Sequence, residues 1–242
     1  QMEKIPIPLP SISVQQEIVR ILNKFTQLEA ELEAELEGRK RQYEYYRNHL
    51  LSYEENEVEW KALGEILKRT KGTKITAGQM KTIHKDKAPV KIFAGGKTVA
   101  FVDFEDIPDK DINREPSIIV KSRGIIEFEY YDKPFSHKNE MWSYYSENEN
   151  IDIKYIYYFL KQQEPYFQKL GAKMQMPQIA LPDTEKFKIP LPPLSEQQHI
   201  ATILDKFDTL VNSISEGLPK EIALRRKQYE YYRERLLSFP KE

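Results

Sequence analysis

The chain has 242 residues, of which 40% are hydrophobic and 31% charged, with a formal net charge of −1. No apolar run approaches the roughly 20 residues that span a bilayer, and the first residues lack the apolar stretch of a signal peptide. The absence of cysteine excludes disulfides and thiolate metal sites. We therefore expect a cytoplasmic protein without a membrane partner, with room for one domain and long appendages.

The chain carries one segment twice. IPLPSISVQQEIVRILNKF at 7–25 matches IPLPPLSEQQHIATILDKF at 189–207, and GRKRQYEYYRNHLLSY at 38–53 matches LRRKQYEYYRERLLSF at 224–239. The second copy holds four extra residues between its two matching blocks. Because four residues are close to one helical turn, both copies can keep the same face along their length.

Each copy predicts an extended, proline-rich segment followed by a long helix. Ser11 or Ser13 in the first copy, and Ser195 in the second, are candidate N-caps. The sequence GLP at 217–219 predicts a break or kink in the second helix, and Gly38 is a milder weak point in the first.

Apolar residues recur at three- and four-residue steps along both predicted helices. They form a narrow stripe flanked by charge, as a two-helix coiled coil requires. The residues of this stripe are Phe25, Leu28, Leu32, Leu36, Tyr43, Tyr46, Leu50, Phe207, Leu210, Ile214, Ile222, Tyr229, Tyr232 and Leu236. One helix cannot bury such a stripe, whereas two matching stripes in one chain can bury each other, and the tyrosines then serve for packing.

A shorter repeat, LEAELEAELE at 28–37, lies within the first helix. Each four-residue unit adds roughly 6 Å of rise and about 40° of rotation to a helix. Such a helix is a spacer whose length can change in whole turns, and it is equally a solvated acidic face.

The middle of the chain, 58–187, lacks the coiled-coil period and predicts a mixed α/β globule. EWKALGEI at 59–66 predicts an edge element or short helix that docks through Trp60 and Leu63. Short β-branched or aromatic runs bounded by turn residues predict strands, and they lie at 90–94, 98–102, 117–120, 124–131 and 141–146. Residues 151–170 predict a helix with a break at Pro165.

The candidate catalytic motifs of the sequence are incomplete. AGGKT at 94–98 resembles part of a phosphate-binding loop, but Lys91 occupies the position of the required first glycine, so a Gly-Gly hairpin turn is favoured. The four histidines are scattered without metal-ligand spacing. We therefore predict no enzyme activity, no metal and no cofactor.

Basic and amide side chains of the middle segment indicate nucleic-acid binding. Between 61 and 97, lysine and arginine far outnumber the two acids, Glu65 and Asp86. Such a cluster can neutralise phosphates, and the candidates are Lys68, Arg69, Lys71, Lys74, Lys91 and Lys97. Later loop-like stretches carry side chains able to contact base edges or a groove, namely Lys121, Arg123, Lys133, His137, Asn139, Gln175 and Gln178. Each one alone is typical of a solvated surface, so the prediction depends on the set.

The order of a repeat, a different domain and the same repeat resembles the DNA specificity subunit of type I restriction–modification systems. The resemblance is carried by IPLPPLSEQQHIATILDKFDTLV, RRKQYEYYRERLL and EWKALGEI, and it extends to YYDKPFSHKNEMWSY and IKYIYYFLK. It implies an α+β fold, in which one mixed α/β target recognition domain is flanked by two long repeat helices forming an antiparallel coiled coil. The expected boundaries are 1–57 for the first repeat region, 58–187 for the recognition domain and 188–242 for the second repeat region.

Subunits of that family normally carry two recognition domains, whereas this chain carries one. KIPIPLP at 4–10 resembles the tail of a preceding domain, so the chain is either a natural half-length subunit or a fragment. A homodimer would supply two domains, and its two-fold symmetry would make the split DNA site palindromic. By the resemblance, copy number in LEAELEAELE sets the gap between half-sites.

The resemblance implies a non-catalytic, sequence-specific DNA-recognition subunit. Its expected partners are double-stranded DNA, methyltransferase subunits and, in the full complex, restriction subunits. Two alternatives stay open. A stand-alone dimeric DNA-binding regulator would bind its site without a methyltransferase, and a truncated subunit would bind methyltransferase without reading DNA.

Overall fold

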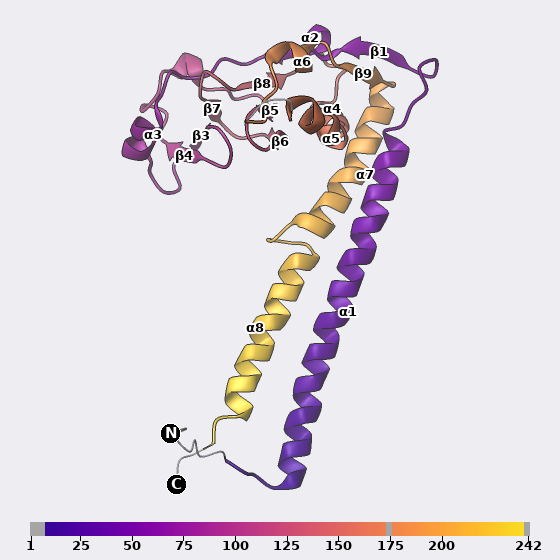
Figure 1. Ribbon diagram of the computed structural model, residues 1–242, viewed down its shortest axis with the longest axis vertical. Helices are drawn as coiled ribbons and strands as arrows, with labels where there is room; N and C mark the ends of the chain where they lie inside the picture. The colour runs from indigo at the N-terminus through magenta and orange to yellow at the C-terminus, as the bar shows by residue number, and fades with distance from the viewer. Residues whose placement is uncertain (1–7, 173–175, 240–242) are drawn as a thin grey trace. The chain divides into compact units, whose positions relative to one another are not determined.

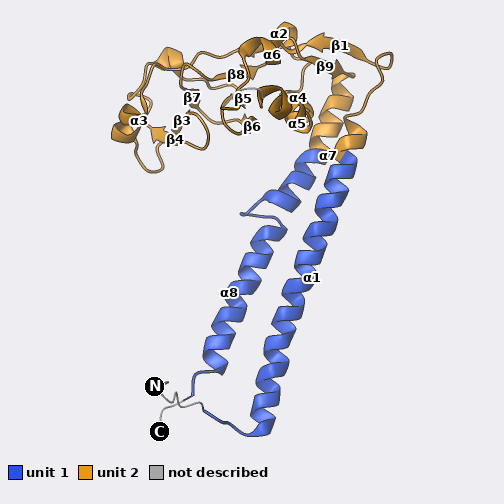
Figure 2. Cartoon of the chain, viewed as in Figure 1, with its two compact units in different colours: residues 1–46, 204–242 blue, residues 47–203 orange. Residues whose placement is uncertain are grey.

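The computed structural model describes residues 8–172 and 176–239. The chain divides into two compact units, one of residues 47–203 and one of residues 1–46 and 204–242 (Figure 2). Residues 47–57 and 188–203 thus group with the middle of the chain, beyond the expected boundaries of 58 and 187. Long-range pairing accounts for this difference, because strand β1 (Glu59–Ala62) pairs antiparallel with strand β9 (Lys188–Leu191).

The unit of residues 47–203, called here the middle unit, contains two further sheets (Figure 1). The four-stranded antiparallel sheet has the order β2 (Lys68–Arg69), β8 (Trp142–Tyr145), β5 (Ser117–Lys121) and β6 (Glu127–Tyr131). The three-stranded sheet has the order β4 (Val99–Val102), β3 (Val90–Phe93) and β7 (Phe135–His137), with β3 and β7 parallel. All five strands expected from the sequence of this segment are confirmed, with small differences at their ends.

The turn between β3 and β4 is the predicted Gly-Gly hairpin. The Ala94 amide donates to the Thr98 carbonyl at 3.0 Å, and Gly96 has a φ of 66°, which a side chain would disfavour. The phosphate-loop interpretation is therefore excluded by geometry as well as by the missing glycine.

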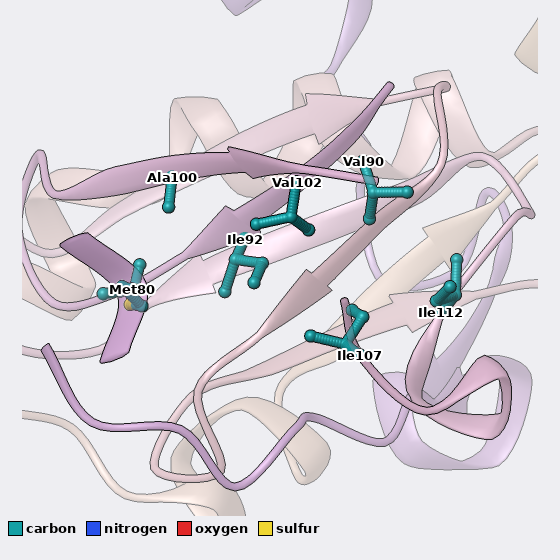
Figure 3. Close-up of a cluster of buried hydrophobic side chains, with 8 residues drawn as sticks. Met80, Val90, Ile92, Ala100, Val102, Ile107 and Ile112 are labelled. Atoms are coloured by element: carbon teal, nitrogen blue, oxygen red, sulfur yellow. The ribbon is translucent and has the colours of Figure 1, made fainter. Parts of the chain in front are cut away.

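Two apolar clusters build the core around β3. The first joins helix α3 (Ala77–Ile83), β3 and β4, and Figure 3 labels Met80, Val90, Ile92, Ala100, Val102, Ile107 and Ile112 from it. The second cluster joins Phe93, Ile119, Phe135 and Met141. Because Phe93 and Ile119 belong to different sheets, this cluster holds the two sheets together.

The helix expected at 151–170 is two helices, α4 (Ile153–Gln162) and α5 (Glu164–Gly171). Asp152 caps α4 by accepting from the Tyr155 amide at 2.9 Å. Pro165 lies in the first turn of α5, where its missing amide costs nothing, so the predicted break falls at Gln163. Three short helices, α2 (Leu63–Ile66), η1 (Asp109–Asp111) and α6 (Leu181–Glu185), complete the unit, and Leu63 docks fully buried as expected.

The other unit, called here the helical unit, is made of long helices. Helix α1 (Ile12–Leu50) runs through Gly38 without interruption, and the second repeat is divided into α7 (Leu194–Asn212) and α8 (Leu218–Leu236). The break predicted at 217–219 is confirmed, and a Cβ on Gly217 would lie 2.3 Å from the Thr209 carbonyl oxygen. Ser11 directly precedes α1, whereas Ser195 lies inside α7 and is therefore not its N-cap.

The two copies of the repeat make the same ring contact reciprocally in the helical unit. The rings of Phe25 and Tyr232 stack at 5.2 Å, and those of Phe207 and Tyr46 stack at 5.4 Å. Phe25 matches Phe207 in the repeat, and Tyr46 matches Tyr232. Between these contacts, Arg226 donates to Glu29 and to Glu33, each at 2.6 Å. Residue numbers thus increase along α1 in the same direction in which they decrease along α7 and α8.

One residue of the predicted stripe does not belong to it. Ile214 is 85% exposed and lies in the non-helical connection between α7 and α8. The extra residues of the second copy therefore contribute to a break instead of adding a helical turn. Tyr43 and Ile222 are buried, while most other stripe residues are half-buried. Among the residues that the structure describes, no helix has the length and apolar character that crossing a bilayer requires.

Candidate nucleic-acid interface

The backbone amides of Thr70 and Thr73 hold the basic segment, residues 68–74, in place through hydrogen bonds. The Thr70 amide donates to the Ser143 carbonyl at 2.9 Å, and the Thr73 amide donates to the His137 carbonyl at 2.8 Å. Thr70 and Thr73 are buried, whereas Arg69, Lys71 and Lys74 are exposed. The backbone pairing therefore turns the basic side chains outward from a fixed support.

His137, predicted to contact DNA, is instead a buried structural residue with 1% of its surface exposed. Its Nδ1 lies 3.0 Å from the Lys138 carbonyl oxygen and its Nε2 lies 2.8 Å from Thr70 Oγ1. Since a carbonyl only accepts, Nδ1 carries the proton and Nε2 accepts from Thr70. Burial lowers the pKa of His137, which favours this neutral form. The side chain fixes the basic segment, and although it lines the second hollow of the groove described below, almost none of its surface is exposed.

Two adjoining hollows form what we call the basic groove. Their volumes are about 630 Å³ and about 540 Å³, and both are lined by Arg69, Thr70, Lys71 and Lys110. Lys110 comes from η1, an element separate from the basic segment, and Asn139 lines the second hollow. Within the described residues, no ion pair involves Arg69, Lys71 or Lys110. Arg69, Lys71 and Lys110 thus line one concave surface, together with the ion-paired Arg114 and the carboxylates of Asp111, Glu115 and Glu147.

Lys110 was not among the predicted residues, and neither were Asn113 and Arg114, which line the first hollow with it. Lys110 stands between Asp109 and Asp111, so a local count of charge hides it. The Asp109 carboxylate accepts from the Arg114 guanidinium at 2.5 Å, which neutralises one acid. Only the fold brings Lys110 into the same groove as Lys71.

Three lysines predicted to bind phosphates or bases are held by carboxylates instead. Glu129 lies 3.0 Å from Lys91 Nζ and 2.8 Å from Lys121 Nζ, and Lys68 pairs with Glu147. Burial alone would raise the pKa of Glu129, but hydrogen bonds from Lys121 and Lys91 outweigh it and lower that pKa. The charges of these lysines are therefore paired within the protein, which the sequence did not indicate.

A smaller recess of about 400 Å³, called here the loop recess, adjoins the groove. It lies between the β3–β4 turn and the loop of Arg123, and Met141 lines both it and the groove. Backbone bonds fix the Arg123 loop, since the Ile179 amide donates to the Ser122 carbonyl at 3.0 Å and the Gly124 amide to the Pro177 carbonyl at 2.9 Å. Arg123 therefore reaches the recess from a rigid support.

The remaining predicted residues are distributed as follows. Lys97 is exposed in the β3–β4 turn, beside the loop recess. Lys133 is exposed between β6 and β7, and it lines neither the groove nor the recess. Gln178 is half-buried and pairs through its backbone with Arg123, while Gln175 lies outside the described residues. In the ranges 8–172 and 176–239, no three histidine or carboxylate side chains gather as a metal site would require.

Comparison with known proteins identifies the family. The family described as the type I restriction modification DNA specificity domain matches residues 1–38 and 55–224. A type I restriction enzyme specificity subunit of Escherichia coli is 41% identical over 99% of this chain and 64% of its own length. A putative type I specificity subunit of Mycoplasma pneumoniae is 29% identical over 100% of this chain and 90% of its own length.

The fold agrees with this assignment. The crystal structure of the S subunit of a type I restriction–modification system from M. genitalium has a TM-score of 0.67 at 17% identity, covering 96% of this chain and 62% of that chain. The chain belongs to the family of type I restriction–modification DNA specificity domains, which is a family of specificity domains and not of catalytic ones. It spans 64% of the length of its Escherichia coli relative.

Proposed function

We propose that this chain is the non-catalytic DNA-recognition subunit of a type I restriction–modification complex. The observation that carries the proposal is the basic groove, in which Arg69, Lys71 and Lys110 converge without carboxylate partners in the described part of the chain. Cations on a concave surface attract the phosphate backbone and fix the register of a duplex. The family to which the chain belongs supports the same conclusion.

The groove and the loop recess have different roles in this proposal. The groove binds phosphates, a contribution that is independent of sequence and sensitive to salt. The loop recess, with Arg123 on its rim and Asn139 close by in the groove, reads base edges, because arginine and asparagine can each make two hydrogen bonds to one base. Met141 lines both the groove and the loop recess, so the phosphate-binding and base-reading surfaces adjoin each other.

The long helices form an antiparallel coiled coil that acts as a ruler. The reciprocal contacts of Phe25 with Tyr232 and of Phe207 with Tyr46 support this pairing, as do the hydrogen bonds from Arg226 to two glutamates of the LEAE repeat. The outer helix faces are the docking surfaces for methyltransferase subunits, and restriction subunits join the full complex. Exposed Tyr45 and Tyr231, which match each other in the repeat, are the aromatic anchors for docking.

Two copies of the chain supply two recognition domains, so the recognised DNA is a split palindrome. Apolar residues of the first repeat support this homodimer, because Leu9 is 84% and Ile12 is 72% exposed. Their counterparts in the second repeat, Leu191 and Leu194, are half-buried. A second chain can cover the exposed pair. A subunit of similar length exists among the relatives, since the match covers 90% of the Mycoplasma pneumoniae protein.

Mapping of DNA methylation tests the proposed function. The full chain is co-expressed with the methyltransferase subunit of its own system, and methylated adenines are located across the host genome. We expect a new motif of two identical, inverted half-sites with a fixed gap, because a two-fold dimer reads the same bases on opposite strands. No new methylation, with both proteins soluble and co-purifying, would contradict DNA recognition. An asymmetric motif would contradict the homodimer alone.

Deletion of one LEAE unit, residues 28–31, tests the ruler. The deletion shortens the helix by about 6 Å, and DNA rises about 3.4 Å per base pair, so the gap should shrink by roughly one or two base pairs. The half-sites should stay the same, because the middle unit is untouched. The length-preserving double substitution Glu31→Gln and Glu35→Gln is the control and should leave the gap unchanged. A deletion that altered the half-sites would rule out the ruler.

A further inference from the structure

The loop recess is lined by fewer charged side chains than the groove and has an apolar floor. Ala94 and Met141 are buried at its base, and Met176, which is 65% exposed, stands on its rim. Lys138 and Glu140 also line it, and their side chains pair with each other at 2.5 Å. Arg123 is then the one lining cation without an ion pair among the described residues. The groove offers a phosphate four lining cations, whereas the recess offers two.

Glycines leave the mouth of the recess open. A Cβ added to Gly95, Gly96 or Gly124 would meet no atom within 4 Å. Each of these glycines lines the recess, so a ligand can approach the backbone at all three positions. The backbone bonds that hold the Arg123 loop, and the hairpin bond between Ala94 and Thr98, fix the two sides of this opening. The recess is therefore a preformed, open site with an apolar floor and one cation on its rim.

The chemistry of DNA contains one group that fits this combination. In the major groove, the edges of bases carry hydrogen-bond donors and acceptors, and thymine alone adds an apolar C5-methyl group. Methionine makes adaptable apolar contacts, and an arginine beside it can bond to the acceptors of an adjacent base. We infer that the loop recess reads a thymine through its C5-methyl group, with Met176 and the floor of Ala94 and Met141 in contact with that methyl. This inference rests on the proposed DNA recognition and adds one base to it.

Uracil substitution in the target DNA tests the inference, since uracil differs from thymine only by the missing methyl group. The duplex probe carries the motif found by methylation mapping, and the full chain is used in complex with its methyltransferase subunit. Each thymine of a half-site is replaced singly by uracil, and the dissociation constants are compared at one salt concentration. We expect one position at which uracil weakens binding about fourfold, the effect of losing one buried methyl.

The variant Met176→Ala identifies the reader of that methyl group. It should weaken binding to the thymine duplex and should reduce the difference between the thymine and uracil duplexes at that position, leaving only the contribution of Ala94 and Met141. The matched control is Ile214→Ala, which removes another exposed apolar side chain, from the connection between α7 and α8, and it should keep the fourfold difference.

Three results would overturn the inference while leaving DNA recognition intact. These are equal binding of every uracil duplex, a half-site made only of G·C pairs, and a thymine preference that is undiminished in the Met176→Ala variant. Failure to bind any duplex would instead contradict the proposed DNA recognition.

Discussion

Charge reversal in the basic groove should reduce DNA affinity about 100-fold in the double variant Lys71→Glu, Lys110→Glu, because two phosphate contacts are lost and two repulsive charges are added. The loss should be similar for specific and non-specific duplexes, since phosphate contacts carry no sequence information. The single variants Lys71→Ala and Lys110→Ala should each lower the slope of log affinity against log salt by about 1. Fluorescence anisotropy over a range of salt concentrations measures both effects.

A control variant with the same change of charge distinguishes the loss of a direct phosphate contact from a general electrostatic effect on DNA affinity. Lys169 is exposed on α5 and lines neither the groove nor the loop recess. Lys169→Glu should therefore leave the salt slope unchanged and lower affinity only slightly. If Lys71→Glu and Lys169→Glu had the same effect, the groove would not be the phosphate-binding surface.

The variant Gly72→Ala should destabilise the middle unit by roughly 3 kcal/mol. A Cβ at this position would lie 2.5 Å from both the Nδ1 atom and the carbonyl oxygen of His137. Neither can move easily, because His137 is bonded to Thr70 and its carbonyl accepts from the Thr73 amide. Urea unfolding followed by tryptophan fluorescence measures this loss selectively, since both tryptophans, Trp60 and Trp142, lie in the middle unit.

A second glycine provides the control for this experiment. Gly78 lies in α3, and a Cβ there would approach only Thr76 Oγ1, at 4.0 Å. Gly78→Ala should therefore raise the free energy of unfolding by up to about 1 kcal/mol, because alanine favours a helix. If the Gly72→Ala variant unfolded at the same urea concentration as the wild-type protein, the basic segment would not be held tightly against His137.

Local patterns predicted much of the fold. The strands, the Gly-Gly hairpin, the helix pair near Pro165 and the break at Gly217 depend on side chains close in sequence, so the sequence alone was sufficient for them. The unit boundaries were less predictable, because they depend on pairing between β1 and β9, which are far apart in the chain. Ile214 left the predicted stripe for a related reason, since helical periodicity cannot show that extra residues are used in a break.

The candidate site was predictable only in part. Arg69, Lys71 and Arg123 line the hollows as a basic pattern suggests. The pairing of Lys91 and Lys121 with Glu129 was not predictable, because sheet register sets both against this carboxylate, and register is not visible in a count of charges. His137 was mistaken for a surface residue because its partner, Thr70, is contributed by a distant strand end.

The reciprocal ring contacts of the helical unit affect how tightly a partner with two binding elements can bind. The contact between Phe25 and Tyr232 is repeated between Phe207 and Tyr46. A partner that binds the helix surface near one of these ring pairs therefore finds a similar surface near the other. A partner carrying two linked copies of a binding element can engage both, and the second engagement then occurs at a high effective concentration. Avidity of this kind arises from duplication of one sequence, without any improvement in a single contact.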